Sequence, residues 1–553
     1  MQYLCKKYKA MTTIRNTLLA TLVMLITASA VAQEKLAVFS DPHLLSSALV
    51  FNPGQPYIDD LATNNKMTDL GPQVMQALVD TLLAIHPSAV LVPGDLTKEG
   101  EARSHSDMAG YLGQLREAGI KVFVIPGNHD VNNSNAVGYY GDYVRPENTL
   151  NSLRFPIRYA DMGYDQALER DSHSLSYLAE PIPGVWLIAV DDSRCKERDN
   201  DASIEANGIS AETLAWILAK ADAGREEGKQ VIMMMHHQLI EHFDDQDNLI
   251  SDAAVTDAAN LRSLFIEHGI KLVLTGHMHI GNITTLFNTA RTDSLVEITT
   301  GSTVTYPCQF RTIEVSRDRG TIAVNTHHIE HIEGYPEFQA YALERYSNSI
   351  RPTIAKFVHQ NWDTILAAIN EYSYLVGEIN ISEQDFTAAI YAALRTQIIQ
   401  LTVAMAQGNE QTRGISNLKN DIFNQVGALV NELLSDQSYF VQLLATQMMR
   451  AKLEEMLGKA IDSIIRDCNG YGTAQAHVTD DLTPTLLFAP IEMAIRGDIT
   501  GDGKVDVSDV NAVINIMLGK AQASSFPGNS DLNDDNKVDV SDVNAVINIM
   551  LGK

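Results

Sequence analysis

Residues 122–130 read Val-Phe-Val-Ile-Pro-Gly-Asn-His-Asp, an apolar run that ends in a short polar cluster. The same arrangement recurs: LAVFS leads into Asp41-Pro42-His43, AVLVP into Gly94-Asp95, VIMMM into His236-His237, and KLVLT into Gly276-His277-Met278-His279. Apolar runs of this length, separated by amphipathic segments, predict an α/β fold with a largely parallel sheet. Such a fold delivers polar side chains to the same ends of its strands, so we expect one polar pocket.

The N-terminal residues 1–32 have the features of a signal peptide. Basic residues (Lys6, Lys7, Lys9 and Arg15) precede an apolar run from Leu18 to Ile26, and Ala30-Val31-Ala32 provides a cleavage site. The run is too short to span a bilayer. We therefore expect a secreted or cell-surface protein with no membrane span after signal removal.

The remaining sequence divides into three parts, as expected for a chain of 553 residues. Residues 33–334 form the α/β domain, and the strand-rich pattern after His279 suggests a second sheet packed on the first, with helices covering both. Residues 335–490 carry apolar residues at three- and four-residue intervals, which predicts a helical accessory domain without a recognisable metal-ligand cluster. Residues 497–553 contain a perfect repeat, because KVDVSDVNAVINIMLGK occurs twice.

Charge and cysteine content restrict the partners and the compartment. The formal net charge of −28 opposes tight association with nucleic acid, because phosphate binding draws on clustered lysine and arginine. Beyond the signal peptide, Cys195, Cys308 and Cys468 are too few for a disulfide framework. One bridge is possible, and the sequence does not pair it.

The polar clusters have the composition of a two-metal hydrolase. Phosphate esters hydrolyse slowly because an anionic centre repels an anionic nucleophile. Two divalent cations about 3.5–4 Å apart bind a hydroxide between them and neutralise the phosphate oxygens. Such a site needs a bridging carboxylate, further oxygen ligands and neutral imidazoles. Asp95 suits the bridging role, and the ligands available around it are Asp41, His43, Asn128, His236, His277 and His279.

Each cluster alone has a simpler explanation. Gly and Asn suit turns, and a lone histidine after an apolar run is usually a core or surface residue. The order and the strand-end context of all the clusters together favour the metal site.

These motifs resemble the calcineurin-like metallophosphoesterase superfamily over roughly residues 34–330. The resemblance implies two facing sheets flanked by helices, with a dimetal site at the strand ends. It assigns the first metal to Asp41, His43, Asp95 and His279, and the second to Asp95, Asn128, His236 and His277. His237 is a rival to His236, but the family uses the first of the pair.

The resemblance also implies catalytic residues and a branch of the superfamily. His129 is expected to contact the phosphoryl group or protonate the leaving oxygen, with Asp130 orienting it. Purple acid phosphatases replace the histidine at position 43 and carry tyrosine at position 98, where this chain has His43 and Lys98. The layout is closer to the cyclic-nucleotide phosphodiesterase and exported phosphoesterase branch. The metals expected are Mn, Fe or Zn.

The C-terminal repeat has the features of two calcium loops, because oxygen ligands alternate along a loop that precedes a helix. The expected ligands are Asp498, Thr500, Asp502, Lys504, Asp506 and Asp509 in the first copy, and Asp531, Asn533, Asp535, Lys537, Asp539 and Asp542 in the second, with the lysines contributing carbonyls. The pattern resembles a type I dockerin, which implies two calcium ions and a cohesin partner on a scaffold or cell surface. Val507-Ser508 and Val540-Ser541 match positions that help to select that partner.

Together these features predict a secreted dinuclear-metal phosphoesterase, with phosphodiesters as the expected substrates, attached through its dockerin to a cohesin-bearing scaffold. The alternative is a catalytically idle scaffold or binding component. Metal analysis and a panel of phosphate monoesters and diesters separate the two.

Overall fold

The computed structural model describes most of the chain after residue 33. The described residues are 34–201, 203–250, 252–288, 293–316, 321–360, 362–370, 381–435, 437–467, 476–478, 480–487, 499–500, 505–522, 530, 532 and 537–550. The predicted signal peptide and Cys468 lie outside them. Cys195 and Cys308 are buried free thiols.

A six-stranded sheet carries the first three polar clusters. Its order is β17-β15-β14-β1-β3-β4. The strands are β1 (Glu34–Val38), β3 (Ala89–Val92), β4 (Lys121–Val124), β14 (Gln309–Ser316), β15 (Thr321–His328) and β17 (Thr485–Leu487). β1, β3 and β4 are parallel, whereas β14 joins β1 in the antiparallel direction.

An eight-stranded sheet carries the histidine clusters, in the order β16-β12-β13-β11-β10-β9-β8-β7. Its strands are β7 (Glu169–Arg170), β8 (Tyr177–Ile182), β9 (Val185–Ala189), β10 (Gln230–Met234), β11 (Leu272–Thr275), β12 (Asn282–Phe287), β13 (Ser294–Thr299) and β16 (Ala476–Val478). The central strands β9, β10, β11 and β13 are parallel. Their carboxyl ends therefore lie at one edge of the sheet.

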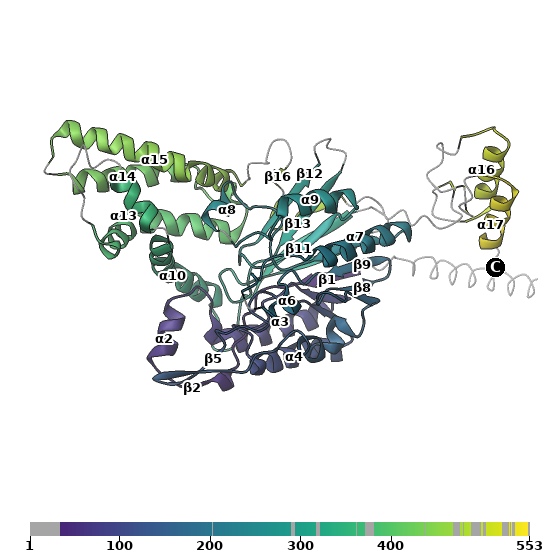
Figure 1. The fold of residues 1–553 in the computed structure, drawn as a ribbon, viewed down its shortest axis with the longest axis horizontal. Coiled ribbons are helices and arrows are strands. Elements are labelled where there is room, and N and C mark those ends of the chain that lie inside the picture. Colours follow the sequence, from purple (N-terminus) through teal and green to yellow (C-terminus); the bar gives the residue numbers. More distant parts are fainter. Residues whose placement is uncertain are drawn as a thin grey trace, which may run out of the picture.

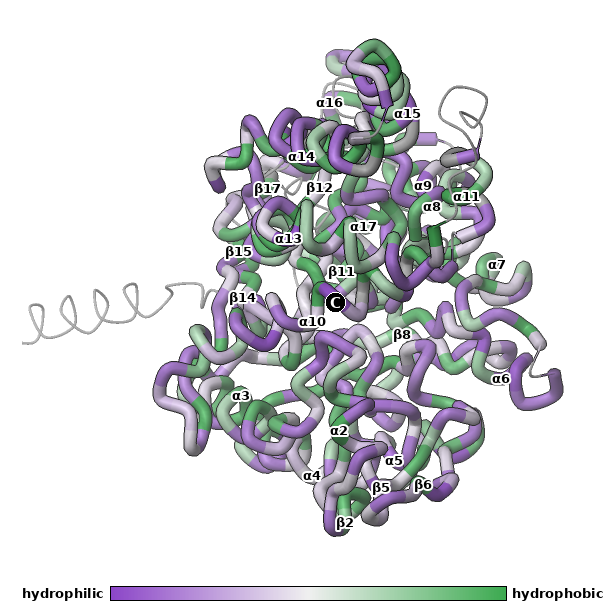
Figure 2. Tube along the Cα trace, turned by 90° about the vertical axis from the view of Figure 1, so that its left-hand side faces the viewer, coloured by the Kyte–Doolittle hydropathy of each residue, from purple (hydrophilic) through white to green (hydrophobic). Residues whose placement is uncertain are grey.

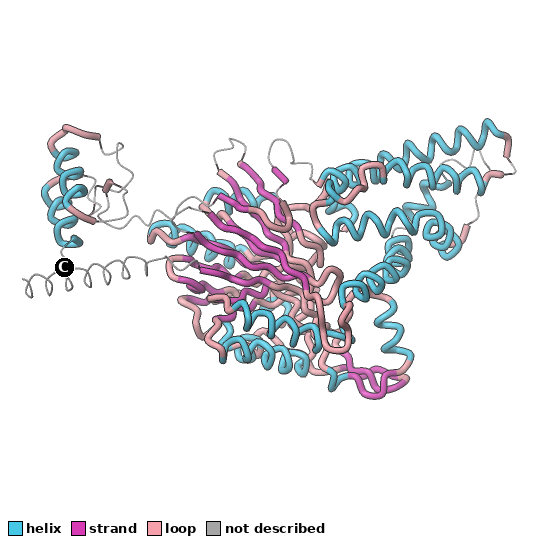
Figure 3. The backbone as a smooth tube through the Cα atoms, turned by 180° about the vertical axis from the view of Figure 1, so that it is seen from behind, coloured by secondary structure: helices cyan, strands magenta, loops and turns pink. Residues whose placement is uncertain are grey.

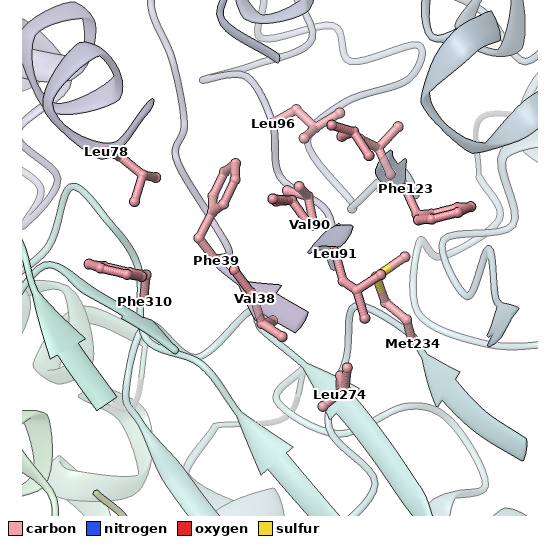
Figure 4. Packing of buried hydrophobic residues seen from close by; sticks show 14 of the residues in the cluster. Val38, Phe39, Leu78, Val90, Leu91, Leu96, Phe123, Met234, Leu274 and Phe310 are labelled. Carbon is pink, nitrogen blue, oxygen red and sulfur yellow. The ribbon is translucent and has the colours of Figure 1, made fainter. Parts of the chain in front are cut away.

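The late strands do not form the second sheet by themselves, which corrects the expectation from the sequence. β12 and β13 extend the sheet of β10 and β11, while β14 and β15 extend the sheet of β1 and β3. The two sheets share one core. Val38 and Leu91 from the first sheet lie in the same buried cluster as Met234 and Leu274 from the second, as Figure 4 shows.

Helices cover the outer faces of both sheets (Figure 1). On the six-stranded sheet these are α3 (Gly71–Ile85) and α4 (Ala102–Glu117), and on the eight-stranded sheet α7 (Ala211–Glu226) and α9 (Ala258–Glu267). The short helices are α2 (Gln55–Ala62), α5 (Phe155–Arg158), α6 (Cys195–Arg198) and α8 (Gln246–Leu249). A small third sheet contains β2 (Val50–Pro53), β5 (Val137–Gly141) and β6 (Tyr143–Pro146).

A helical region follows the sheets and projects to one side of them (Figure 3). Its helices are α10 (Phe338–Gln360), α11 (Trp362–Asn370), α13 (Glu383–Gln407), α14 (Leu418–Leu433) and α15 (Tyr439–Arg466). Both hydrophobic and hydrophilic residues occur in this helical region (Figure 2), and buried residues such as Phe423 of α14 and Ile461 of α15 share one apolar cluster. By length and composition alone α13 could cross a membrane, and it packs against α10 and α14.

The helical region ends earlier than the predicted boundary at residue 490. After α15 the chain returns to the catalytic sheets, where β16 pairs with β12 and β17 pairs with β15. The strands at both of these edges are short, so they carry almost no periodic signal. The C-terminal repeat folds as predicted around α16 (Val507–Met517) and α17 (Val540–Met550), which share a small apolar core.

Candidate metal centre

The loops after five strands bring the predicted ligands together. Asp41 follows β1, Asp95 follows β3, Asn128 follows β4, His236 follows β10, and His277 follows β11. The first three come from the six-stranded sheet and the last two from the eight-stranded sheet. The centre therefore lies where the strand ends of the two sheets meet.

The ligand side chains lie on tight turns with unusual backbone conformations. The φ angles are 51° at Asp41, 38° at His43, 50° at Asp95, 68° at His277 and 59° at His279. Residues other than glycine avoid positive φ, at a cost of about 1–3 kcal/mol each where the conformation is strained. Five such residues at one place indicate that the fold holds these side chains in position at the expense of stability.

Close packing at Gly94 also serves the centre. Its φ is 96°, and a Cβ there would lie 2.7 Å from Nδ1 of His236. That nitrogen lies 2.7 Å from the carbonyl oxygen of Pro93 and so holds the donor proton. Nε2 of His236 is left to face Asp95.

The first ligand group contains Asp41, His43, Asp95 and His279. Nε2 of His43 lies 2.9 Å from Nε2 of His279 and 3.5 Å from Oδ2 of Asp95. Nε2 of His279 lies 3.5 Å from Oδ1 of Asp41, a buried oxygen without a hydrogen-bond partner. One proton can form a hydrogen bond in only one of these close contacts. A cation between the side chains can bind the facing nitrogen and oxygen atoms together.

The second group shares Asp95 with the first. Nε2 of His236 lies 3.4 Å from Oδ2 of Asp95 and 3.0 Å from Oδ1 of Asn128. Nδ1 of His277 lies 3.2 Å from the same oxygen of Asn128. His237 is placed differently, because its Nδ1 lies 3.2 Å from Oδ2 of Asp192. Between the two neighbours, His236 is therefore the one that faces Asp95.

Electrostatics favour metal ligation at this centre. Burial lowers the pKa of His43 and His277 well below its ordinary value and also lowers that of His279, so these imidazoles are neutral at pH 7. Burial opposes ionisation of Asp95, but His236 and His129 outweigh it and hold the pKa of Asp95 well below its ordinary value. Although burial also opposes a charge on His236, Asp95 raises the pKa of His236 to about 10. Ligands must be deprotonated, so a cation beside Asp95 displaces that proton.

The donor set fits two divalent cations. Three carboxylate or amide side chains and four imidazoles converge, and Asp95 Oδ2 is common to both groups. Mixed nitrogen and oxygen donors of this kind suit Mn, Fe or Zn.

His129 lies next to the two groups, with Nε2 at 3.9 Å from Oδ2 of Asp95. Its other nitrogen, Nδ1, lies 2.8 Å from Oε2 of Glu99. Burial raises the pKa of Glu99, but the bond from His129 and the nearby Lys98 and Lys66 outweigh it and lower that pKa. Glu99 is therefore ionised and accepts the Nδ1 proton, which leaves Nε2 facing the centre.

The expected pairing of Asp130 with His129 is wrong. The carboxylate of Asp130 is buried and accepts hydrogen bonds from the backbone of Leu96 and Gly127 and from both the backbone and hydroxyl of Thr97. Asp130 thus ties the loop after β3 to the loop after β4. It positions the loop that carries His129, and Glu99 orients the imidazole.

Sequence reasoning missed two functional residues, Glu99 and Asp192. Asp192 accepts hydrogen bonds from the backbone of His236 and His237, at 3.2 and 2.8 Å. It follows the apolar run VWLIAV, so the strand-end pattern that located the other clusters was also present here. Glu99 has no such signal, because it lies in a loop four residues after Asp95.

Comparison with known families agrees with this geometry. Residues 34–281 match the family model of the calcineurin-like phosphoesterases. The chain carries a calcineurin-like phosphoesterase domain. Residues 496–551 match the type I dockerin domain, so the chain also carries a dockerin. The predicted architecture of a two-sheet phosphoesterase, a helical region and a dockerin is confirmed.

Several solved structures are similar to the phosphoesterase domain. A dimetal phosphatase from Danio rerio is 12% identical, with 54% of this chain and 97% of that chain covered and a TM-score of 0.38. Purple acid phosphatase PPD1 from yellow lupin is also 12% identical, with 54% and 52% covered and a TM-score of 0.35. No curated protein matches the chain.

In the dockerin, the two repeats have the same local structure. Asp509 accepts backbone hydrogen bonds from Ile499 and Asp506, and Asp542 accepts them from Leu532 and Asp539. Of the other predicted calcium ligands, Thr500, Asp506, Lys537 and Asp539 are described, while Asp498, Asp502, Lys504, Asp531, Asn533 and Asp535 lie outside the described residues. Val507, Ser508, Val540 and Ser541, predicted to select the partner, are exposed.

Proposed function

We propose that the phosphoesterase domain hydrolyses phosphodiesters with two divalent transition-metal ions bound on either side of Asp95. The observation that carries this proposal is the position of Asp95 Oδ2, at 3.5 Å from Nε2 of His43 and 3.4 Å from Nε2 of His236. One carboxylate oxygen between two imidazole groups is the arrangement that a bridging ligand needs. When bound, two such ions activate water and neutralise the phosphate oxygens.

The protein's own residues supply orientation and a proton. Asp41, His43 and His279 would hold the first ion, and Asn128, His236 and His277 would hold the second. Glu99 accepts the Nδ1 proton of His129 and so directs Nε2 of His129 to the substrate. With a quarter of its side chain exposed, protonated His129 is accessible to donate a proton from Nε2 to the leaving alcohol.

Hydrolysis assays on the purified full chain test this proposal. After loading with Mn, Fe or Zn, the chain should hydrolyse bis(p-nitrophenyl) phosphate faster than p-nitrophenyl phosphate. Chelation should remove the activity, and the same metal should restore it. A metal-loaded protein that hydrolyses only the monoester would contradict the diester preference and leave the phosphoesterase activity intact.

The alternative is a catalytically idle component of a dockerin–cohesin assembly. Catalysis is favoured by the combination of a complete set of converging ligands with a partly exposed imidazole, His129, held beside Asp95 by Glu99. A protein that binds two metal ions yet hydrolyses neither ester class would support the idle component.

We further propose that the chain is exported and attached to a scaffold or cell surface by its dockerin. The exposed pairs Val507-Ser508 and Val540-Ser541 begin equivalent helices, so either repeat can present the same surface to a cohesin. Calcium-dependent binding to a cohesin from the same genome tests this. Lack of binding to every such cohesin in calcium would contradict it.

A further inference from the structure

A second group of convergent carboxylates lies far from Asp95 in the sequence, at the junction between the helical region and the sheets. Glu410 comes from the turn after α13, Asp467 from the C-terminal cap of α15, and Asp481 from the connection between β16 and β17. Their exposed fractions are 6%, 5% and 1%. One oxygen from each lies within 4.8 Å of the other two.

Two oxygens of this group lack a hydrogen-bond donor. Oε2 of Glu410 and Oδ2 of Asp467 are both buried and accept no hydrogen bond from a donor group of the described residues. The two carboxyl groups are in hydrogen-bonding contact with each other, which requires either a shared proton or a cation between them. A buried ionised carboxylate without a partner is costly, and three together repel one another. Something other than the described hydrogen bonds must therefore neutralise the group.

Asp481 is fixed in place from both sides. Its Oδ1 accepts a hydrogen bond from the backbone of Ile283 in β12 at 2.7 Å, and its Oδ2 accepts one from the backbone of Asn409 at 3.0 Å. Gly408 packs directly against it, because a Cβ at this residue, whose φ is 68°, would lie 2.9 Å from Cβ of Asp481. Each carboxylate oxygen accepts more than one contact, so Asp481 retains acceptor capacity toward the group.

The local charge leaves room for a divalent cation. Arg311 acts on Asp481, but its described hydrogen bonds go to the backbone carbonyls of Asp481 and Thr299 and to the hydroxyl of Thr326. These bonds do not neutralise the three carboxylates directly. Calcium binds oxygen ligands at about 2.3–2.6 Å, so two ligands of one ion are up to about 5 Å apart, which accommodates the observed spread.

We propose that Glu410, Asp467 and Asp481 bind a calcium ion that fastens the helical region to the catalytic sheets. The site contains oxygen donors only, which favours calcium over the transition metals of the catalytic centre. It joins three segments that are distant in sequence, one of which hydrogen-bonds to β12. Bound calcium stabilises the folded chain because the unfolded chain does not hold the three carboxylates together.

Without calcium, the group can be neutral only by keeping protons. Burial raises the pKa of Asp481 to about 7 and that of Asp467 to about 6, and it also raises the pKa of Glu410. Shared protons are therefore the competing explanation. Calcium measurements distinguish the two.

The first test is the calcium content of the full chain, kept loaded with its transition metals. The Glu410→Gln/Asp467→Asn double variant should bind one calcium ion fewer than the wild type. The matched control is Glu455→Gln, because Glu455 is an exposed carboxylate of α15 that pairs with Lys452 outside the group, and this variant should bind as many calcium ions as the wild type. Equal content in the double variant and the wild type overturns the proposal.

The second test follows unfolding by tryptophan fluorescence. The three tryptophans, Trp186, Trp216 and Trp362, all lie outside the dockerin. Their fluorescence therefore does not follow calcium binding by the dockerin loops directly. Calcium at a hundredfold excess over its Kd should raise the unfolding midpoint of the wild type by about 3 °C. The same shift should persist in an Asp506→Asn/Asp539→Asn variant of the dockerin loops and disappear in the double variant.

If the double variant does not fold, the calcium-dependent shift of the wild-type unfolding midpoint still tests the site. No calcium-dependent shift of the wild-type midpoint overturns the calcium site. A double variant that is more stable than the wild type, with no calcium response in either, identifies shared protons instead.

Discussion

The catalytic centre and the carboxylate junction both gather charged side chains from distant segments, but they differ in how the sequence encodes them. At the catalytic centre each ligand follows a strand, and mixed imidazole and carboxylate donors converge on Asp95. At the junction three carboxylates come singly from a turn, a helix end and a connection between strands. The ligands of a site at strand ends recur after apolar runs and can be recognised in the sequence. The carboxylates at a junction between domains belong to no recurring motif.

The largest expected effect is at Asp95. Asp95→Asn removes the charge shared by the two ligand groups, so both metals should be lost and phosphodiester hydrolysis should fall below detection. Metal content and turnover of the purified variant measure this. Wild-type turnover in Asp95→Asn would contradict the assignment of the centre. The junction variants Glu410→Gln and Asp467→Asn should keep both transition-metal ions.

A smaller loss is expected at His129, which donates a proton without holding a metal. His129→Ala should retain both metals and lose roughly 10²–10⁴-fold in kcat, the usual contribution of a general acid. Substrates with a better leaving group should restore part of the rate. Equal losses for good and poor leaving groups would exclude the proton-donor role.

Glu99 should matter less than His129 because it acts through the imidazole. Glu99→Gln removes the charged acceptor of the Nδ1 proton, and we expect kcat to fall about 10–100-fold with little change in KM. Glu147→Gln, which alters a carboxylate bonded to Tyr140 instead, is the matched control. If the kcat of Glu99→Gln equals that of Glu147→Gln, another group orients His129.

The strands that form apolar runs in the sequence could be predicted from the sequence alone. β1, β3, β4, β10 and β11 were predicted because buried parallel strands read as apolar runs, and the polar ends of these runs supplied the metal ligands. The pairing of strands was not predicted: β14 joins β1, which lies far from it in sequence. Which two strands pair depends on which edge of the sheet is available to a late strand. The hydrophobic periodicity of a strand does not indicate that edge.

The remaining errors concern residues and short strands whose partners are set by the path of the backbone. Asp130 directly follows His129 in the sequence, whereas Glu99 lies in the loop after β3, and only the path of the backbone decides which carboxylate reaches His129. β16 and β17 have three residues each, too few for a pattern. The junction carboxylates are 57 and 14 residues apart, so no local motif joins them.

The junction should also respond to pH in a way that the catalytic centre does not share. An acid with a raised pKa in the folded chain keeps its proton longer there than in the unfolded chain. The stabilising contribution of Asp467 is therefore complete below the ordinary value of 3.8 and is lost as the pH rises to about 6. In chelator, the wild type should lose stability relative to Glu410→Gln/Asp467→Asn over this window, by on the order of a few kcal/mol.

Added calcium should abolish most of that loss in the wild type and leave the double variant unchanged. Denaturant unfolding at pH 4, 5.5 and 7 measures the difference. A pH response that is identical in the two proteins would show that the three carboxylates do not titrate as a buried group.

The smallest effect is expected from removal of the dockerin. Its two helices pack against each other around their own apolar core, and the catalytic ligands lie in the sheets. A chain ending before residue 497 should keep the wild-type kcat and KM and lose cohesin binding. A large drop in kcat would place a dockerin contribution in the catalytic centre.

The most direct test of the central claim is a crystal structure of the metal-loaded protein with anomalous scattering recorded at the metal absorption edge. We predict two anomalous peaks on either side of Asp95, one beside Asp41, His43 and His279 and the other beside Asn128, His236 and His277. A single peak, or two peaks that do not share Asp95, would contradict the dinuclear centre.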